Sequence, residues 1–310
     1  MSKLRKIQTA FGLIARNRKH LVHALGYNGF LSWLPTRQYL QLLYYVQVGK
    51  PLNLNNPRTF NEKLQWLKLY WRDDTASSCS DKYEVRQYVE SKGLGATLNE
   101  LYGVYSTADE VDFDSLPDRF VLKSANGSNC VIICKDKSRF DKDEARRTMR
   151  AWLRKDFYRG YREWVYRNLP PRIVAERYLE DKNGELLDYK IFCFNGEPKL
   201  VEVDIDRYGE HKRNLYDLQW NLQPFGIRHP TAPDRKLPKP AMLDAMIEMA
   251  RVLSAGFPHV RVDVYDVDST IYFGELTFFH GGGVETFTDE RIHEQLGSWL
   301  QLPDKALKHV

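Results

Sequence analysis

The stretch Arg261-Val262-Asp263-Val264-Tyr265 is followed, after a short turn, by Tyr272-Phe273-Gly274-Glu275-Leu276-Thr277-Phe278-Phe279. Side chains alternate across a pleated strand, so the two valines share one face of the first run while Arg261 and Asp263 share the other. We expect the two runs to form an antiparallel hairpin that brings Asp263 close to Glu275. Neighbouring carboxylates repel unless a proton or cation lies between them. The pattern favours a divalent metal, with a surface hairpin whose acids face water as the alternative.

A second motif reads as strand, small polar loop and strand over residues 120–134, Phe-Val-Leu-Lys-Ser-Ala-Asn-Gly-Ser-Asn-Cys-Val-Ile-Ile-Cys. Lys123 lies where the first strand ends. The small loop residues let backbone amides approach an anion closely, and the lysine supplies a compact positive charge for phosphate oxygens. The motif is typical of a flap over a triphosphate, although Asn126-Gly127 between two apolar runs also fits an ordinary hairpin turn.

A third motif pairs the apolar run at 172–180, which is interrupted by Glu176, with the alternating stretch at 188–201, which turns at Asn195-Gly196. The first run suits a strand that leads into a hinge. The second suits two further hairpin strands.

In this order, the motifs resemble the ATP-grasp superfamily, in particular its TupA-like branch, which is named for a teichuronopeptide biosynthesis protein. The resemblance runs from about Asn56 to Pro303 and also includes residues 56–64, Asn-Pro-Arg-Thr-Phe-Asn-Glu-Lys-Leu, and Asp81-Lys82-Tyr83. It implies an α+β ATP-grasp fold, in which two α+β subdomains clamp a nucleotide between antiparallel sheets. The expected division is a basic amphipathic helical extension at 1–61, an N-terminal α/β subdomain at 62–115, a lid at 116–180 and a catalytic subdomain at 181–310.

The resemblance also implies which residues bind ATP. Lys123 would contact the phosphates from the lid, and Lys82 would reach them from the preceding subdomain. Glu176 would accept a hydrogen bond from the adenine amino group, next to the backbone of the purine hinge, and Asp188 would lie near the ribose. The full expected set is Lys82, Lys123, Ser124, Asn126, Gly127, Glu176, Tyr178, Leu179 and Asp188.

Asp263 and Glu275 would be the Mg²⁺ ligands by the same resemblance. Lys190 would be aimed at the terminal phosphate, and Arg261 would neutralise charge that develops during phosphoryl transfer. Many ATP-grasp enzymes place an asparagine two residues after the metal-binding glutamate, whereas this chain has Thr277, a substitution that the TupA-like branch shares. A hydroxyl is a weaker ligand than an amide oxygen, so the change affects how a second metal is held.

The implied chemistry is activation of a carboxylate by ATP to an acylphosphate, which an amine then attacks. The implied setting is bacterial surface polysaccharide synthesis (capsule, teichuronopeptide or lipopolysaccharide), with a carboxylate-bearing saccharide and an amino acid as substrates. Cationic and polar residues after the second hairpin, Arg207, Arg213 and Asn214, are candidates for substrate binding, although the segment also reads as a solvated turn. His280, before Gly281-Gly282-Gly283, could touch phosphate or acceptor, or merely cap the strand.

Three other functions stay open on the sequence alone. Asp204-Ile205-Asp206 and Asp266-Val267-Asp268 are DxD-like triplets that a glycosyltransferase could use to hold a metal on a nucleotide sugar, but predicted hairpin turns explain both. A non-catalytic nucleotide-binding protein of the polysaccharide machinery and a kinase are the other two.

Charge is distributed unevenly along the chain. Residues 1–61 contain nine of the 46 Lys and Arg and none of the 41 Asp and Glu. Leu4, Ile7, Phe11 and Ile14 recur at helical spacing among these bases, which predicts a basic amphipathic helix that lies on an anionic leaflet or packs on the core. No apolar run approaches the roughly 20 residues that span a bilayer. We expect a cytoplasmic protein whose N-terminus makes peripheral contact with the inner membrane face or with a lipid-linked glycan, and no nucleic-acid partner.

The remaining composition fits a compact cytoplasmic enzyme. The chain has 310 residues, of which 43% are hydrophobic, enough for a sizeable core. Its four cysteines form no CxxC pair, which argues against zinc and disulfides. Helical periodicity and end signals predict helices at 60–71, 82–92, 141–155 and 240–256.

Overall fold

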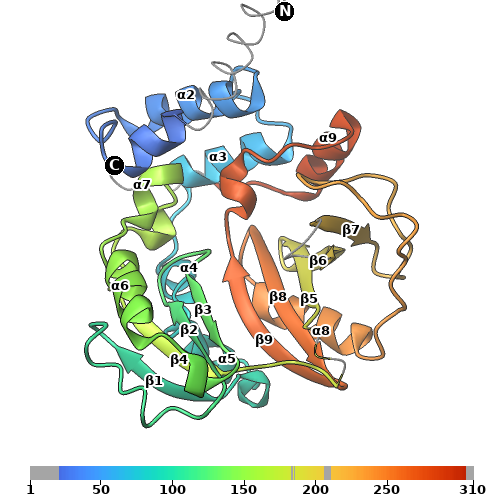
Figure 1. Ribbon diagram of the computed structural model, residues 1–310. Helices are drawn as coiled ribbons and strands as arrows, with labels where there is room; N and C mark the ends of the chain where they lie inside the picture. The colour runs from blue at the N-terminus through green and yellow to red at the C-terminus, as the bar shows by residue number, and fades with distance from the viewer. Residues whose placement is uncertain (1–20, 183, 185, 206–210, 305–310) are drawn as a thin grey trace, which may run out of the picture.

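A computed structural model describes residues 21–182, 184, 186–205 and 211–304. It confirms the predicted α+β class, because two antiparallel sheets are each covered by helices. In Figure 1 the four-stranded sheet lies on the left and the five-stranded sheet on the right, and helices α2, α3 and α9 lie above them. The segment that joins the two sheets, residues 178–187, crosses at the bottom of that view.

The four-stranded sheet, which we call the lid sheet, has the order β1-β4-β2-β3. Alternation along β2 buries Phe120 and Leu122 under helix α6, with Met149 and Trp152, while Lys123 faces the other side. This confirms the predicted strand-loop-strand motif. The strands are β1 (Leu101–Tyr105), β2 (Phe120–Ser124), β3 (Val131–Cys134) and β4 (Ile173–Arg177), and the helix is α6 (Lys142–Leu153).

The five-stranded sheet, which we call the catalytic sheet, has the order β7-β6-β5-β8-β9. One face is apolar, with Ile191, Val201 and Val262 fully buried, and helix α8 packs against β5, β6 and β8. The predicted hairpins at 188–201 and 260–277 are confirmed. The elements are β5 (Asp188–Phe194), β6 (Glu197–Ile205), β7 (Lys212–Tyr216), β8 (His259–Val267), β9 (Thr270–Thr277) and α8 (Leu243–Ser254).

Residues 21–48 pack on the protein core. Residues 21–27 are helical, and α2 (Thr36–Val48) buries Tyr39, Leu40, Leu43 and Tyr44. Helix α3 (Phe60–Tyr70) matches the predicted helix at 60–71, and it begins at a capping box between Thr59 and Glu62. The predicted amphipathic helix around residues 4–14 lies outside the described residues.

The remaining helices are short. They are α4 (Asp74–Cys79), α5 (Val85–Ser91), α7 (Phe157–Tyr161) and α9 (Glu290–Trp299), with 3₁₀ turns at Gly95–Thr97, Lys137–Arg139, Trp164–Tyr166 and His280–Gly283. None of the helices in the described ranges combines the length and apolar character that crossing a bilayer requires.

Strand β1 pairs with β4 and so belongs to the lid sheet, although the expected division assigned residues 62–115 to a preceding subdomain. The boundary at 115–116 stays a prediction. The packing also divides into two hydrophobic clusters, a smaller one inside the lid and a larger one that joins the N-terminal helices, the catalytic sheet, α8 and α9.

Candidate active site

The face of the catalytic sheet opposite α8 is densely charged. Register places Lys190 opposite both Glu202 and Asp263, Asp263 opposite Glu275, and Asp204 opposite Arg213, so alternate positions of all five strands bring their side chains to one face. This surface, which we call the charged face, carries Asp188, Lys190, Glu202, Asp204, Arg213, Arg261, Asp263, Glu275 and Thr277.

Arg261 and Asp263 form a buried bidentate pair. Nε and Nη2 of Arg261 donate to the two carboxylate oxygens of Asp263 at 2.7 and 2.6 Å. Burial raises the pKa of Asp263 against the opposing effect of Arg261. Burial alone would lower the pKa of Arg261, but the Asp263, Glu202 and Glu275 carboxylates outweigh it and raise that pKa. The guanidinium therefore stays charged beside the two candidate metal ligands.

Lys190 lies between two carboxylates on the same face. Its ammonium contacts Asp188 and lies 2.9 Å from Asp204. Arg213 donates to Asp204 through Nε at 2.8 Å. Burial by itself would raise the pKa of Asp204, but Lys190 and Arg213 hold it well below its ordinary value. The structure thus places Asp188, Lys190 and Arg213 in one network.

Glu202 is the exception in this network because neither of its carboxylate oxygens has a hydrogen-bond partner among the described residues. The side chain is fully buried, and Nε of Arg213 lies 3.2 Å from Oε1. Burial raises the pKa of Glu202. No signal in the sequence singled out this residue, because a glutamate in an alternating strand normally faces water.

Glu275 is the most accessible acid of the pair that was predicted to bind metal. Its side chain is 36% exposed, whereas that of Asp263 is 4% exposed. Oε1 accepts from the Thr277 hydroxyl at 3.3 Å, and Oε2 lies 3.4 Å from the ammonium of Lys82. Burial would raise the pKa of Glu275, but Lys82 and Arg261 lower it to about 2.

Lys82 joins the two sides of the site. Its ammonium also donates to the carbonyl of Gly127, in the loop between β2 and β3, at 2.7 Å. Its backbone N–H donates to the carbonyl of Ala125 in the same loop at 2.8 Å. The lysine that the sequence placed at the phosphates therefore lies between the lid loop and Glu275, which defines the position of the candidate nucleotide site.

Lys123 and Glu176 lie diagonally across β2 and β4 on the lid face opposite α6, and they form an ion pair of 2.7 Å. Val131 and Ile133 of β3 alternate onto the same face, where they are largely exposed. Exposed aliphatic side chains beside a carboxylate and an ammonium suit a flat heteroaromatic ring with a polar edge. The arrangement fits the adenine role expected of Glu176.

The other expected nucleotide contacts are placed as follows. Ser124 faces the lid core, where its hydroxyl donates to Oδ1 of Asn126 at 3.0 Å, so both side chains stabilise the loop. Tyr178 lies at the end of β4 with the guanidinium of Arg119 over its ring at 4.5 Å, and Leu179 is buried. Only their backbone groups would serve the expected purine hinge.

His280 contacts Arg261. Nη1 of the arginine lies 2.8 Å from Nδ1 of His280, and since a guanidinium only donates, Nδ1 accepts and the neutral ring carries its hydrogen on Nε2. Burial, followed by the charge of Arg261, lowers the pKa of His280 well below its ordinary value. His280 thus orients Arg261 as a neutral acceptor.

Two further residues at the site were not expected from the sequence. The ammonium of Lys68 donates to the carbonyls of Tyr161 and Gly282 at 2.9 and 2.6 Å, and the amide of Gln65 donates to Gly282 and Gly283. Both belong to α3 and are fully buried. The only feature of the sequence that could have indicated them is a polar side chain on the helix face that carries Leu64 and Leu67. Burial lowers the pKa of Lys68 to about 8.

Asn214 is not brought to the charged face, which corrects its expected grouping with Arg213. It lies on the opposite face of β7 and accepts from the backbone of Ala232, while its amide donates to the carbonyls of Ala232 and Arg235. Its role there is to hold the loop that follows β7. Arg207, the other expected cation, lies outside the described residues.

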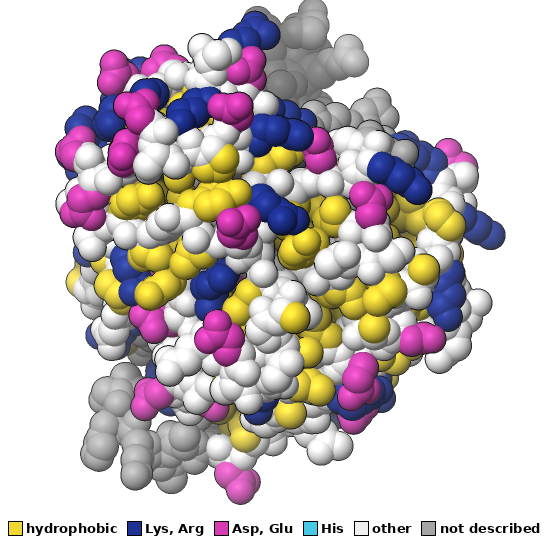
Figure 2. All heavy atoms as spheres, turned by 90° about the horizontal axis from the view of Figure 1, so that it is seen from below, with side chains coloured by type: hydrophobic (Ala, Val, Ile, Leu, Met, Phe, Trp, Pro, Cys, Tyr) yellow, Lys and Arg dark blue, Asp and Glu magenta, His cyan; other side chains and the backbone are white. Residues whose placement is uncertain are grey.

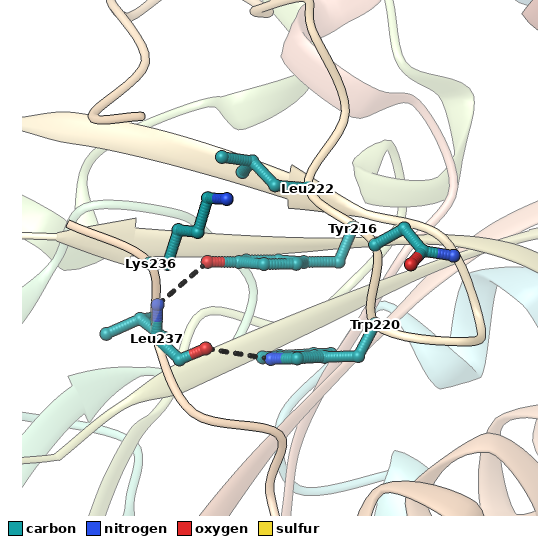
Figure 3. A pocket seen from close by; sticks show the side chains of 6 residues that line it. Tyr216, Trp220, Leu222, Lys236 and Leu237 are labelled. Carbon is teal, nitrogen blue, oxygen red and sulfur yellow. Dashed lines mark hydrogen bonds between the residues drawn. The ribbon is translucent and has the colours of Figure 1, made fainter. Parts of the chain in front are cut away.

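A cavity of about 350 Å³ also lies on this opposite side of β7. Figure 3 shows the rings of Tyr216 and Trp220 stacked in parallel, with Leu237 bonded to both through its backbone. Lys236, Leu222 and Asn221 also line the cavity. Because Tyr216 and Arg213 point to different faces, this cavity is not part of the charged face.

The DxD-like triplets do not form a shared metal site. Asp204 is committed to Lys190 and Arg213, and Asp206 lies outside the described residues. Asp266 caps its own hairpin turn by accepting from the backbone N–H of Ser269 at 3.0 Å. Hairpin structure therefore accounts for the second triplet, as the sequence indicated.

The charged face fits a magnesium ion that receives few ligands from the protein. In the described part of the chain no group of three or more His, Cys, Asp or Glu side chains could hold a metal. Asp263 and Glu275 supply two hard carboxylates, and nucleotide phosphates and water are the usual source of the remaining oxygens. Asp263 would have to loosen its bidentate pairing with Arg261 to take part.

A family model described as TupA-like ATPgrasp matches residues 62–301. The chain belongs to this family. The matched region contains the lid sheet, the catalytic sheet and Lys82, and therefore every element that forms the candidate site. No curated protein sequence matches the chain.

The TupA-like chain also resembles solved ATP-grasp structures. D-alanine–D-alanine ligase from Bacillus anthracis shares 17% identity at a TM-score of 0.38, over 64% of this chain and 57% of that one. Phosphoribosylamine–glycine ligase from Thermotoga maritima shares 12% identity at a TM-score of 0.42, over 66% of this chain and 48% of that one. Biotin carboxylase from Campylobacter jejuni shares 12% identity at a TM-score of 0.42, over 78% of this chain and 49% of that one. The chain thus spans about half the length of these proteins.

Proposed function

We propose that the protein is an ATP-dependent carboxylate–amine ligase that forms an amide bond and releases ADP. One observation supports the proposal: Lys82 lies between the lid loop and Glu275, which neighbours Asp263 and Arg261, so the residues proposed to bind phosphate and those proposed to bind metal lie close together. Membership of the TupA-like ATP-grasp family supports it.

The main residues of the site have the following roles in this reaction. Lys82 and Lys123 bind the phosphates, and Glu176 accepts from the adenine amino group. Asp263 and Glu275 hold Mg²⁺, which supplies charge neutralisation for the phosphates. Arg261, oriented by His280, stabilises negative charge at the transferred phosphoryl group, and Lys190 is the second cation of the charged face. Transfer to a carboxylate gives an acylphosphate, and the amine attacks its carbonyl with release of phosphate.

The acceptor is proposed to be a carboxylate-bearing saccharide of a bacterial surface polysaccharide, and the amine an amino acid. Arg213, beside Asp204 on the charged face, is the cation best placed to bind an acidic acceptor. We further propose a cytoplasmic location with peripheral contact between the basic N-terminal segment and the inner membrane face, since residues 1–61 lack acidic side chains.

The decisive experiment combines nucleotide binding with trapping of the intermediate. Thermal shift with ATP and Mg²⁺ is compared with a panel of UDP-sugars, and stabilisation by ATP alone is expected. With uronic acids and hydroxylamine, a ligase gives a hydroxamate and ADP, whereas a kinase gives a stable phosphate ester. Stabilisation by a UDP-sugar, or ATP binding without any ADP across the acid and amine panel, would contradict the proposal.

Glu275→Gln supplies the matched test of the site. We expect at least a 100-fold loss of ADP formation, because the metal would lose one of its two protein carboxylates. Glu197→Gln is the control, since Glu197 lies in the same sheet in an exposed pair with Arg251. Equal losses in the two variants would remove the proposed role of Glu275.

A further inference from the structure

Two aromatic side chains protrude from the N-terminal part of the fold. Phe30 is 70% exposed and Trp33 is 76% exposed, which makes them the most exposed large hydrophobic residues that the structure describes. Large aromatic side chains normally lose much of their surface on folding, so a pair this open to solvent needs an explanation.

The backbone holds this pair outward. Residues 28–35 form successive tight turns, with hydrogen bonds from Phe30 to Leu25, from Ser32 to Gly29 and from Leu34 to Leu31. Leu31 and Leu34 pack against the core, which leaves Phe30 and Trp33, also three residues apart, on the outer side. Nη2 of Arg162 donates to the carbonyl of Leu31 at 2.9 Å and fixes the loop to the lid segment.

The sequence on both sides of the loop, over residues 1–61, carries only positive charges. Residues 1–61 contain no Asp or Glu, and six of their nine Lys and Arg fall within residues 1–20, directly before the helix at 21–27 that leads into the loop. A run of seven helical residues spans only about 10 Å. The basic segment therefore joins the fold close to the aromatic pair.

The opposite end of the molecule lacks this combination. Figure 2 shows that end, where Lys and Arg are interspersed with Asp and Glu and with hydrophobic side chains. In Figure 1 the N-terminal helices lie at the top, and the segment that joins the two sheets lies at the bottom. A surface that binds through residues 28–35 would leave the joining segment facing away from it.

We propose that Phe30 and Trp33 insert into the headgroup region of an anionic lipid bilayer, as a second contact beside the basic segment. The inference rests on the proposed membrane contact of the N-terminus. Trp and Phe favour the boundary between headgroups and acyl chains, and basic residues are attracted to the anionic surface. Either contact alone gives weak, reversible binding, whereas the two together retain the protein on the membrane.

The test is vesicle flotation with the full chain, without ATP or acceptor, so that its outcome is independent of ligase activity. Wild type is expected to float with vesicles of phosphatidylcholine and phosphatidylglycerol at 7:3 but not with phosphatidylcholine alone. Phe30→Ser with Trp33→Ser should lower the partition coefficient at least tenfold. Leu186→Ser, which changes an exposed hydrophobic residue between the two sheets, should leave it unchanged.

The remaining outcomes are equally decisive. Equal flotation of the double variant and wild type would assign binding to the basic segment alone and overturn the inference. Absence of wild-type flotation at low salt would overturn both membrane contacts. A dimeric wild type with a monomeric double variant, by light scattering, would show that the pair binds a second copy of the chain. Circular dichroism confirms that each variant is folded.

Discussion

His259 shows how a buried titratable residue links the fold to pH. Its ring is fully buried among Phe60, Phe192 and Phe194, and Nδ1 lies 2.8 Å from the carbonyl of Cys193. Burial lowers the pKa of His259 to about 3. The unfolded chain, with a histidine pKa of about 6.5, therefore binds a proton in acid that the native state does not.

The native state should lose stability as the pH falls below about 6.5, because His259 contributes fully only above the unfolded pKa. Each such histidine gives a slope of up to about 1.4 kcal/mol per pH unit down to its folded pKa. Urea unfolding at pH 7, 6 and 5 measures this slope. In His259→Gln the decline between pH 6.5 and 5 should be shallower, although the variant is less stable at pH 7. If stability declines with pH equally steeply in wild type and in His259→Gln, His259 is not the cause of the decline.

At the same scale, alternation was enough to predict the meeting of Asp263 with Glu275 and its shared face with Arg261. The contacts of Lys68 and Gln65 with the glycine loop were not predictable, because they depend on how α3 packs against a loop more than 200 residues away. The grouping of Asn214 with Arg213 was wrong for a local reason, because both residues lie in β7 and neighbouring positions of a strand face opposite ways.

Among the elements, the loop between β2 and β3 is held to the catalytic sheet through Lys82. Lys82→Met removes the ammonium contacts with Gly127 and Glu275, so the amides of residues 125–130 should exchange hydrogen several-fold faster without nucleotide. ATP affinity should also fall at least tenfold, since the phosphates lose a cation. Hydrogen exchange by mass spectrometry and calorimetry measure the two effects.

Lys142→Met is the control for this variant, because Lys142 forms an exposed ion pair with Asp114 in the same lid. Exposed pairs contribute little, so loop exchange should match wild type. If the loop amides exchange hydrogen equally slowly in Lys82→Met and in Lys142→Met, Lys82 does not hold the loop.

The turn after β9 requires glycine at 282. Its φ is +63°, and a Cβ there would lie 2.4 Å from the ring of Tyr161. Gly282→Ala should therefore cost about 3 kcal/mol, from left-handed strain and overpacking combined. Gly49→Ala, at φ +83° with open space around it, should cost only about 1 kcal/mol. Equal costs in urea unfolding would show that the loop yields to the added methyl group.

The hairpins and most helices were predictable because period and end signals are local. Helix α5 is instructive, since the helix predicted at 82–92 begins only at Val85. Asp81 accepts from the backbone N–H groups of Tyr83 and Glu84, which holds a turn where the sequence suggested helix. That turn is what places Lys82 at the lid loop.

On the scale of the whole molecule, residues 21–48 are part of the core. Deleting residues 1–48 removes four fully or almost fully buried side chains of α2, each worth about 1.5–3 kcal/mol. That loss is comparable to the entire stability of a domain. The truncated chain should be insoluble or unfold without cooperativity in a calorimetric scan.

A substitution on each side of α2 gives the finer comparison. Leu40→Ala, at a buried position, should cost about 2–5 kcal/mol, whereas Leu42→Ala, on the exposed side, should cost less than about 0.5 kcal/mol. A truncated chain that melts cooperatively near the full-length temperature would show that the N-terminal helices are dispensable.

The general architecture followed from the sequence because several ordered motifs resembled one family. The position of β1 did not, because its pairing with β4 joins residues about 70 positions apart. Only strand pairing in the folded protein reveals that β1 belongs to the lid sheet.

The buried ammonium of Lys68 has a mechanical consequence. It holds the carbonyl of Tyr161, next to the lid, and the carbonyl of Gly282, next to the hairpin of β8 and β9. Separating these two segments would break at least one of the two hydrogen bonds of the ammonium, each worth about 1.5–3 kcal/mol for a charged donor. The cleft between the two sheets should therefore open on the side that lies away from Lys68. ATP would enter from that side.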